Sequence, residues 1–468
     1  MRTEFFIFFF AYFVLILFVS LFFSRRMKSL EDFFLASRKL PAFLVFLSIS
    51  ASFFGATSTL VSVDEAFDKG LSSFWVMGVP AILTVLVFAF ILARPIRRLH
   101  IISLPDLVEL RYGRIVRHLS SVLIVWYMTV LAASQMVALG NFIKAFLGTS
   151  YFISLLFGTV VVLCYSVFGG FFSVTVTDGI QFFLLVAGTV ALLVFLWEPS
   201  ILRHISLCAS EIQKRGYFDF FFNIKRNLLI VVSFTLAWII SPIVWQRIQS
   251  ARSLKKARYG LFAASGTFVV LYGILVLIGM FSLPMIFSLD RSQPLLSELI
   301  SSKTGIILGG ILFVAVVSAI MSTMDSAINT GALSLNRDIY QQLFSRKEKK
   351  EVLISRLSTI LIGAAGFLIA TRIQSILKTL GLASEIMTEG LFIPGIVMIF
   401  SKKKIPFAGF SSLVLGGGFA LTGFLCQTGV FPLKWPSWPY SVPYGLGLSL
   451  LGFVIGFGID TVKNKSSR

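Results

Sequence analysis

The hydrophobic pattern of this chain is a series of long apolar stretches separated by short polar segments. A helix that spans a membrane needs roughly 20 apolar residues, and thirteen stretches meet that requirement. They cover residues 4–24, 41–63, 72–93, 119–146, 152–169, 177–197, 227–246, 261–288, 304–335, 352–371, 376–400, 406–427 and 440–459. The segments between them are too short for a separate soluble domain. The pattern predicts an all-α integral membrane protein with about 13 transmembrane helices, forming one domain over residues 1–468.

The composition supports a membrane protein and excludes several other classes. Charged residues make up 13% of the chain, whereas soluble domains carry about 25%. The net charge of +20 lies in short loops between the spans, so we do not expect nucleic acid as a partner. The three cysteines have no pair spacing and predict neither disulfides nor a zinc site. No acidic metal-binding run or nucleophile–histidine pair indicates an enzyme.

The positions of Lys and Arg predict the orientation of the chain. With thirteen spans, every basic cluster falls on the same side, which the positive-inside rule makes the cytoplasmic side. These clusters include Arg25, Arg26, Arg94, Arg97, Arg98, Arg252, Lys255, Lys256, Lys402, Lys403, Lys404, Lys463 and Lys465. We therefore expect a multi-pass protein of the cell membrane, with its N-terminus outside and its C-terminus in the cytoplasm.

Two spans contain residues that interrupt helices. The second span is rich in Ser, Thr and Gly over residues 47–59, and the seventh contains Ser241-Pro242. Pro removes an intrahelical hydrogen bond. Because these spans are five apart, the pattern predicts two inverted five-helix repeats, over residues 41–197 and 227–400, as in many transporters. One N-terminal and two C-terminal helices would flank the repeats. The alternative is two ordinary kinks, since Pro and Gly are common in membrane helices.

The ninth span carries a polar cluster at mid-depth. Ser318, Ser322 and Ser326 lie four residues apart, beside Thr323 and Asp325. A carboxylate in hydrocarbon costs at least about 2.5–3.5 kcal/mol, whereas side chains three or four residues apart can converge on one ion. Sodium, like other hard cations, binds oxygen ligands. The cluster predicts a cation site; the alternative is hydrogen bonding between helices.

A second constellation runs from Gly169 to Gln181. The glycines are expected to end one helix and turn a short cytoplasmic loop, which would place Asp178 in the first turns of the sixth span. Asp178 could then cap that helix, where the helix dipole favours an acid. The other interpretation pairs Asp178 with Arg247 at the cytoplasmic end of the seventh span, as a latch of an inner gate.

These motifs together resemble the sodium:solute symporter family, which includes sugar, proline, pantothenate, sialic acid and iodide transporters. The resemblance extends from about Leu30 to about Phe400. Its markers are Glu31–Arg38, Ala51–Gly55, Leu104–Leu107, Arg111–Gly113, Gly169, Gly170, Thr177, Asp178, Gln181, Gln246, Arg247, Ala251–Ser253, Met321–Ser326 and Asp338–Tyr340. The resemblance implies the leucine-transporter fold and sodium-coupled import of a small organic solute by alternating access.

The resemblance also implies two sets of site residues. A sodium site would be formed by the backbone carbonyls of Ala51, Phe54 and Ala319 with the hydroxyls of Ser322 and Thr323. A second sodium site, which some members have nearer the cytoplasm, matches Asp178, Asp325 and Ser326. Asp178 and Arg247 match an inner-gate pair of sugar-transporting members. No other metal and no cofactor is implied.

The expected solute pocket departs from that of well-known members. Phe53 stands where proline-transporting members have Asp, and Ser58 where sugar-transporting members have Gln. Phe234 and Ala237 replace an Asn and a gating Tyr of the sugar-transporting members. A pocket lined by these four residues and Trp238 is rather apolar, which argues against sugar, weakens the expectation of proline, and suits an apolar amino acid or an organic anion.

Two further acids and three alternative functions complete the predictions. Glu385 is expected near the outer interface in water, and the deeper Glu389 is a candidate solute or proton group. A transport-inactive sensor, a channel-like protein of the same fold and a proton-coupled symporter stay open as alternatives to sodium symport. The sequence predicts no oligomeric state.

Overall fold

The computed structural model describes residues 3–24, 30–99, 101–286, 294–344, 351–373, 375–427 and 429–466. Within these ranges the regular structure is helical, apart from one isolated β-bridge. The longer helices are α1 (Thr3–Ser24), α3 (Ala42–Phe53), α5 (Phe74–Val87), α8 (Arg114–Leu147), α9 (Tyr151–Leu196), α11 (Ile224–Ile240), α13 (Leu254–Phe281), α16 (Ile306–Leu333), α18 (Glu351–Ala370), α21 (Pro406–Gln427) and α22 (Val442–Ser466).

Shorter helices connect or continue the long ones. The α-helical segments are α2 (Leu30–Leu35), α4 (Ser62–Lys69), α6 (Ala93–Leu99), α7 (Leu104–Tyr112), α10 (Ile201–Glu211), α12 (Pro242–Ser250), α14 (Leu283–Ile286), α15 (Leu295–Lys303), α17 (Gln341–Leu343), α19 (Ile376–Glu385) and α20 (Phe392–Phe400). Four π-helical segments are η2 (Thr57–Val61), η4 (Phe88–Leu92), η5 (Ser334–Tyr340) and η7 (Ile386–Leu391). Two 3-10 segments are η1 (Ala36–Arg38) and η3 (Gly70–Ser73).

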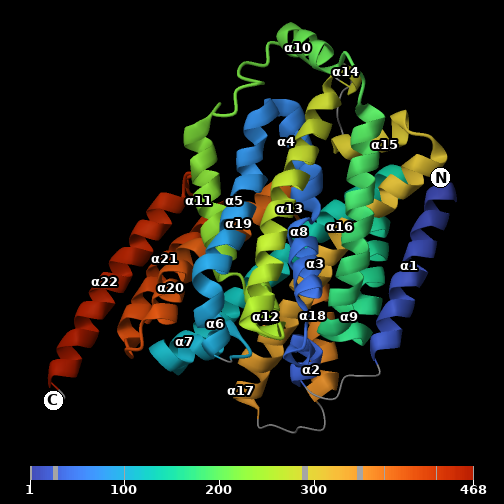
Figure 1. Ribbon diagram of the computed structural model, residues 1–468. Coiled ribbons are helices and arrows are strands. Elements are labelled where there is room, and N and C mark those ends of the chain that lie inside the picture. Colours follow the sequence, from blue (N-terminus) through green and yellow to red (C-terminus); the bar gives the residue numbers. More distant parts are fainter. Residues whose placement is uncertain are drawn as a thin grey trace.

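The helices form a bundle whose two ends differ (Figure 1). The N-terminus lies near the upper end, and the C-terminus lies at the lower left, at the end of α22; α6, α7 and α17 also lie at the lower end. Helix α1 packs on α9 and α16 at one side, whereas α22 packs on α21 at the other. The two ends of the described chain therefore lie on opposite faces, which agrees with an odd number of spans.

The number of membrane spans depends on how broken helices are counted. Eleven described segments are long and apolar enough to cross a membrane, or twelve if α11 and α12, bent by 44°, form one span. The bend falls at Pro242, whose missing N–H interrupts the helical ladder. Thr57–Leu99 counts as one segment, although the chain reverses at Gly70, where φ is 65°. If α3 with α4 is counted as one span and α5 with α6 as another, the total becomes thirteen. Because this total depends on how the helices are paired, the count of thirteen stays a prediction.

One predicted loop is wrong. Helix α9 runs for 46 residues, and Gly170, with φ 55° and ψ −175°, is the one residue inside it that departs from helical geometry. Gly170 divides α9 into two of the eleven spans, Tyr151–Phe168 and Gly170–Leu196. The second helix begins directly at this glycine, without the expected loop, because a single glycine can make the kink. Asp178 therefore lies about two turns inside the second half of α9, and the interpretation of Asp178 as a helix cap is wrong.

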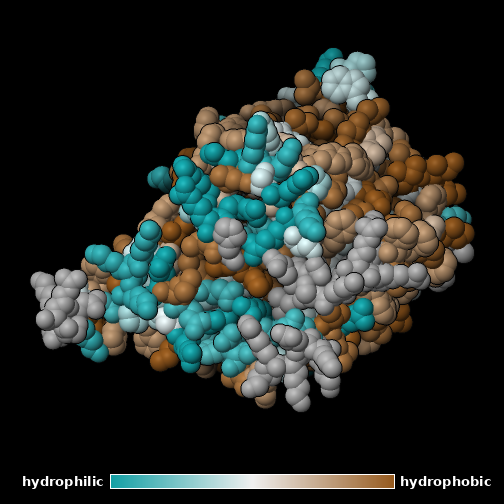
Figure 2. Space-filling view, turned by 60° about the horizontal axis from the view of Figure 1, so that its bottom comes forward, coloured by the Kyte–Doolittle hydropathy of each residue, from teal (hydrophilic) through white to brown (hydrophobic). Residues whose placement is uncertain are grey.

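Polar contacts hold the elements together at the lower end of the bundle. Leu40 N–H donates to Ser250 O (3.0 Å) and Arg252 N–H donates to Leu40 O (2.8 Å), which ties the start of α3 to the end of α12. Arg117 on α8 bridges Asp106 on α7 (2.8 Å) and Asp338 on η5 (3.2 Å). Figure 2 shows hydrophilic residues gathered on this end, surrounded by hydrophobic surface.

Candidate functional site

The break in the second predicted span lies against the polar cluster of the ninth. Helix α3 ends at Phe53, and the chain bends before η2 begins at Thr57. The hydroxyl of Ser322 on α16 donates to Ala51 O at 3.0 Å and to Ala319 O at 3.2 Å. The hydroxyl of Thr323 donates to Ser52 O at 3.3 Å and to Ala51 O at 3.5 Å. Carbonyl and hydroxyl oxygens from two helices therefore converge at the break.

Four of the five expected sodium ligands share this cluster, namely Ala51, Ala319, Ser322 and Thr323. The fifth, Phe54, caps α3 at the break, and its ring packs on Tyr272 with centroids 4.7 Å apart. The structure thus brings together residues that are more than 260 positions apart in the sequence.

Gly55 allows the two helices to approach this closely. A β-carbon at this position would lie 2.5 Å from the Thr323 hydroxyl and 2.6 Å from Oε1 of Gln135. Both distances are far below a normal contact, so any side chain here would push α3 away from α16. Gln135 on α8 in turn accepts a hydrogen bond from Ala56 N–H at 2.7 Å, which satisfies a backbone donor freed by the break.

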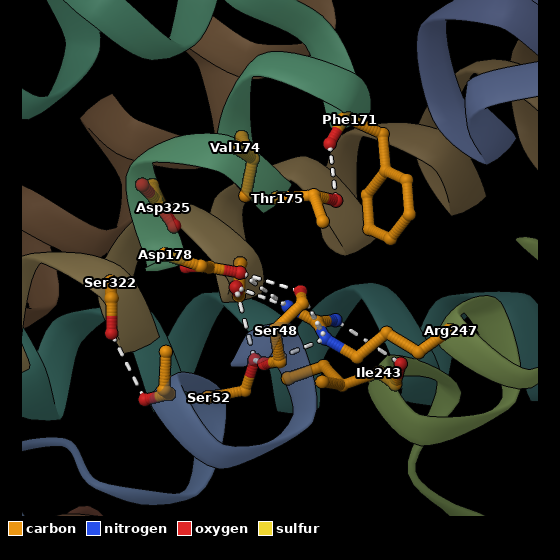
Figure 3. A network of polar contacts seen from close by, with 12 residues as sticks. Ser48, Ser52, Phe171, Val174, Thr175, Asp178, Ile243, Arg247, Ser322 and Asp325 are labelled. Carbon is orange, nitrogen blue, oxygen red and sulfur yellow. Dashed lines mark hydrogen bonds and ion pairs between the residues drawn. The ribbon is translucent and has the colours of Figure 1, made fainter. Parts of the chain in front are cut away.

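The predicted pair of Asp178 and Arg247 is present and buried. Both side chains are 0% exposed, and Nη2 of Arg247 lies 3.3 Å from Oδ2 of Asp178 (Figure 3). Ser48 on α3 joins them: its hydroxyl donates to Asp178 (2.6 Å) and accepts from Arg247 Nε (2.9 Å). The guanidinium also donates to the hydroxyl of Ser326 (2.7 Å) and to Ile243 O (3.2 Å). Helices α3, α9, α12 and α16 thus meet at one buried cation.

The last expected residue of the second sodium site, Asp325, lies beside this cluster (Figure 3). Its Oδ2 accepts a hydrogen bond from the hydroxyl of Tyr165 at 2.8 Å. Among the described residues, three buried oxygens at this place have no hydrogen-bond donor: Oδ1 of Asp178, Oδ1 of Asp325 and Oε1 of Gln181. Buried hydrogen-bond acceptors normally have a donor. Three acceptors without a donor in one region are oxygen atoms of the kind that a bound cation requires as ligands.

Helix α1, outside the predicted repeats, takes part in this arrangement. The amide of Gln181 donates to the Tyr12 hydroxyl at 2.7 Å, which turns its Oε1 away from α1. Ser20, also on α1, donates to Tyr165 O at 2.5 Å. The sequence interpretation gave Tyr12, Ser20 and Tyr165 no role, because nothing in an apolar first helix indicates which span it packs on.

A small cavity lies beside the break. Its volume is about 50 Å³, enough for a few water molecules. Its walls come from α3, η2, α8, α11, α12, α16 and α19; the lining residues are Ser52, Phe53, Gly55, Thr57, Ser58, Tyr127, Leu131, Gln135, Trp238, Ser241, Ile243, Val244, Thr323 and Leu380. None of the residues that line this cavity is charged.

Three of the expected pocket residues, Phe53, Ser58 and Trp238, line this cavity. Phe234 lies behind it and stacks on Trp238, with ring centroids 5.2 Å apart and planes 6° from parallel. Ala237 is buried and is not in the lining. Tyr127, Gln135 and Ser241 were not expected there. An amide in the middle of an apolar span, as at Gln135, is the signal that could have indicated its place.

The broken helices, the two clusters of buried oxygens and the adjoining cavity are the features of a cation-coupled secondary transporter. Residues 33–416 match the sequence model of the sodium:solute symporter family. This match covers most of the chain, and the protein belongs to that family. Membership of this family confirms the predicted sodium-coupled symport and the predicted class of multi-pass membrane protein.

The relatives of this chain agree with the family assignment. The chain is 24% identical to the osmoregulated proline transporter OpuE of Bacillus subtilis, over 94% of this chain and 93% of the relative. It is 23% identical to the high-affinity choline transporter 1 of Drosophila melanogaster, over 91% and 72% of the two chains. A solved Na+-coupled sialic acid symporter superposes with a TM-score of 0.80 at 18% identity, covering 97% of each chain. This structural likeness confirms the predicted fold.

Proposed function

We propose that the primary sodium site lies at the break in α3, with Ala51 O, Phe54 O, Ala319 O, Ser322 Oγ and Thr323 Oγ1 as ligands. The observation that carries the proposal is the direct contact of the two α16 hydroxyls with α3 carbonyls at the break, 3.0 to 3.5 Å apart. Neutral oxygens bind sodium weakly and reversibly, as a coupling ion requires. When the ion binds, these hydroxyls turn their lone pairs towards it in place of donating to Ala51 and Ser52.

A second sodium ion would bind between Asp178, Asp325 and Ser326, with Gln181 as an added ligand. The three unsatisfied oxygens of Asp178, Asp325 and Gln181 support this site. Since Asp178 also pairs with Arg247, the same carboxylate would serve an ion site and an inner gate. Each sodium that enters down a 100 mV potential supplies about 2.3 kcal/mol, so a second ion doubles the electrical term.

The solute would be a small zwitterionic amino acid or a related compound with a cationic nitrogen. Phe53, Tyr127 and Trp238 present aromatic rings to the cavity, and aromatic faces bind ammonium groups. Amide and hydroxyl groups of Gln135 and Ser241 supply hydrogen bonds without charge. A proline transporter and a choline transporter are among the relatives, and both solutes have a substituted nitrogen. The cavity must open further to admit such a molecule.

The two inverted repeats would comprise residues 41–197 and 227–400, with α1 before them and α21 and α22 after them. Each repeat would begin with a broken span, α3–α4 in the first and α11–α12 in the second. The basic end of the bundle would face the cytoplasm of the cell membrane, with the N-terminus outside, because the positive-inside rule fixes that orientation.

The proposal is tested by uptake into proteoliposomes with an inward sodium gradient. Labelled proline and other small amino acids, choline and glucose would be compared with sodium present and with sodium replaced by potassium. We expect sodium-dependent uptake of an amino acid or ammonium solute and none of glucose. Uptake that is equal without sodium would contradict sodium coupling, and sodium currents without uptake would indicate a channel.

A further inference from the structure

Two carboxyl groups lie in the interior of the protein, away from the sites described above. Glu385 ends α19, and Glu389 lies four residues later in η7. Glu385 is 2% exposed and Glu389 is 0% exposed. The expectation that Glu385 lies in water is therefore wrong. Neither residue lines the solute cavity, so Glu389 is not a solute-binding group in this conformation.

Both carboxyl groups face the C-terminal helix pair, α21 and α22. A β-carbon at Gly445 on α22 would lie 2.1 Å from Oε2 of Glu389 and 2.2 Å from its carboxyl carbon. A β-carbon at Gly416 on α21 would lie 1.9 Å from the backbone oxygen of Glu389. Glycines on two helices thus form a slot that closely encloses this residue. One turn before Gly445, Ser441 donates a hydrogen bond to Glu385.

Glu389 has no partner of any kind within the described chain. Neither carboxyl oxygen has a hydrogen-bond donor, and no ion pair reaches it. Among the elements packed around η7, Tyr127 on α8 is buried and lines the solute cavity. The remaining charged or titratable groups lie at the helix ends or point outward. They are Lys378 on α19, Arg114, Arg117, His118 and Lys144 on α8, Lys225 and Arg226 on α11, Cys426 on α21, and Tyr444, Asp460 and Lys463 on α22.

These groups are too far along their helices to neutralise Glu389. From Arg226 to Ser233, the residue of α11 that contacts η7, the helix rises by about 10 Å, and from Gly445 to Asp460 by about 22 Å. An ionised carboxyl group buried without a donor or a cation costs many kcal/mol, and such a group takes up a proton instead. The geometry of this slot therefore fits a neutral carboxylic acid.

We propose that Glu389 is a proton-binding site at the joint between η7 and the helix pair α21–α22. Protons reach and leave Glu389 from the outer side by way of Glu385 and Ser441, because these two residues lie one turn closer to the outer end of the span. With the proton bound, η7 packs in the glycine slot as seen here. When the proton leaves, the charge cannot remain in the slot, and η7 moves away from α22 towards water.

Contacts on the opposite face of η7 connect this joint to the solute cavity. The hydroxyl of Thr388 donates to Ser233 O on α11 at 2.8 Å. Trp438 donates to the Ser233 hydroxyl (3.0 Å), and its ring packs on Phe234, which stacks on the cavity residue Trp238. A displacement of η7 therefore shifts the cavity wall formed by α11. Proton binding at Glu389 is an input to transport that is separate from the sodium sites.

The first test is thermal stability of the purified full-length protein against pH, which does not depend on the solute. Since the folded protein binds one proton more than the unfolded chain, its stability decreases as pH rises. The decrease is present wherever the folded protein holds the proton and the unfolded chain has lost it, and it fades once the folded site itself loses the proton. From about pH 5.5 upward we therefore expect the melting temperature of the wild type to fall by roughly 2 °C per pH unit. Glu389→Gln and Glu389→Met both lack the ionisable group and should make this decrease less steep by the contribution of one proton.

Controls separate a proton from another ligand and from general effects of pH. Glu211→Gln makes the same chemical change at an exposed position of α10 and should keep the wild-type slope. The scan is repeated with sodium replaced by potassium, and the slope should not change. A slope as steep in both Glu389 variants as in the wild type would overturn the proposal. A wild-type slope that sodium abolishes would overturn it too, because the slot would then hold a metal cation.

The second test is uptake at saturating sodium over the same pH range. We expect wild-type uptake to fall at least about threefold towards high pH, and Glu389→Gln to vary by less than about twofold. An equal fall in both proteins would overturn the proposed link between the joint and the cavity. If no solute is transported under any condition, the proposed function fails, while the thermal test still decides whether Glu389 binds a proton.

Discussion

The substitution Asp178→Asn tests the buried latch most directly. Arg247 is 0% exposed, and within the described chain Asp178 supplies the one carboxylate closer than 4.0 Å to its guanidinium. The asparagine keeps the size of the side chain and can still accept the hydrogen bond from Ser48. What the change removes is the negative charge, so the buried guanidinium loses its ion-pair partner.

The magnitude follows from the burial of the pair. Removing one partner of a buried ion pair costs about 3–5 kcal/mol. Asp325, the second buried carboxylate of this region, compensates in part, so we take about 3 kcal/mol. This penalty applies only to the conformation in which the pair is shut from water, and it disappears where Arg247 is hydrated. The substitution therefore favours the conformation open at this end by about 10²-fold.

Accessibility of a cysteine in the cavity wall measures this shift. Val244 lines the cavity on α12, close to the latch. Val244→Cys would be introduced after the native Cys164, Cys208 and Cys426 are replaced by serine. A membrane-impermeant thiol reagent is then applied from the cytoplasmic side, in potassium so that no sodium binds at Asp178. We expect Asp178→Asn to raise the labelling rate at least about tenfold. The increase is smaller than the shift in the equilibrium where the parent protein is already partly open.

The double variant decides whether the uncompensated charge is the cause. Asp178→Asn with Arg247→Gln removes both charges, so labelling should return towards the parent rate, and the two single effects should not add. An Asp178→Asn protein that is labelled no faster than its parent would refute the reasoning. A double variant labelled faster than either single variant would refute it too.

Three further predictions concern the sodium sites and the approach of α3 to α16. Ser322→Ala with Thr323→Ala should raise the half-saturating sodium concentration for uptake at least about tenfold; an unchanged value would contradict the site. Gly55→Ala places a methyl 2.5 Å from the Thr323 hydroxyl and should abolish uptake while the protein still reaches the membrane; normal uptake would show that the helices separate without cost. Tyr12→Phe removes the acceptor that orients Gln181 and should lower the Hill coefficient for sodium towards one, whereas an unchanged sodium curve would mean that Gln181 binds no ion.

The parts of the site that could be predicted from the sequence are those in which a polar group has few partners available. Asp178, Arg247 and Asp325 stand in long apolar spans, where a charge must find a charge or an ion. That constraint was enough to anticipate the pair of Asp178 with Arg247. The hydroxyls of Ser322 and Thr323 likewise pointed to freed carbonyls, and the break at residues 51–59 was the nearest source of them.

The remaining contacts depend on how helices pack, which local sequence does not encode. Tyr12 lies in an apolar first helix, and nothing around it shows that it faces Gln181 on α9. The slot at Gly445 needs both the register of α22 and the wide turn of η7 before it admits the Glu389 carboxyl group. The loop expected after Gly169 is absent for a different reason. A pair of glycines permits a turn of several residues, but in this structure the single residue Gly170 makes the kink.

The spacing of contacts along α3 explains how sodium binding could control the inner latch. Ser48 holds Asp178 and Arg247, while the carbonyl of Ala51, three residues later, contacts the Ser322 hydroxyl. Three residues rise by about 4.5 Å in a helix, and both contacts belong to the 12-residue rod of α3. A displacement of α3 that opens one cluster must therefore open the other. An ion that holds Ala51 against α16 also holds Ser48 between Asp178 and Arg247. Sodium at the break therefore favours a closed inner end through the helix α3 itself, and no longer series of side-chain contacts is needed.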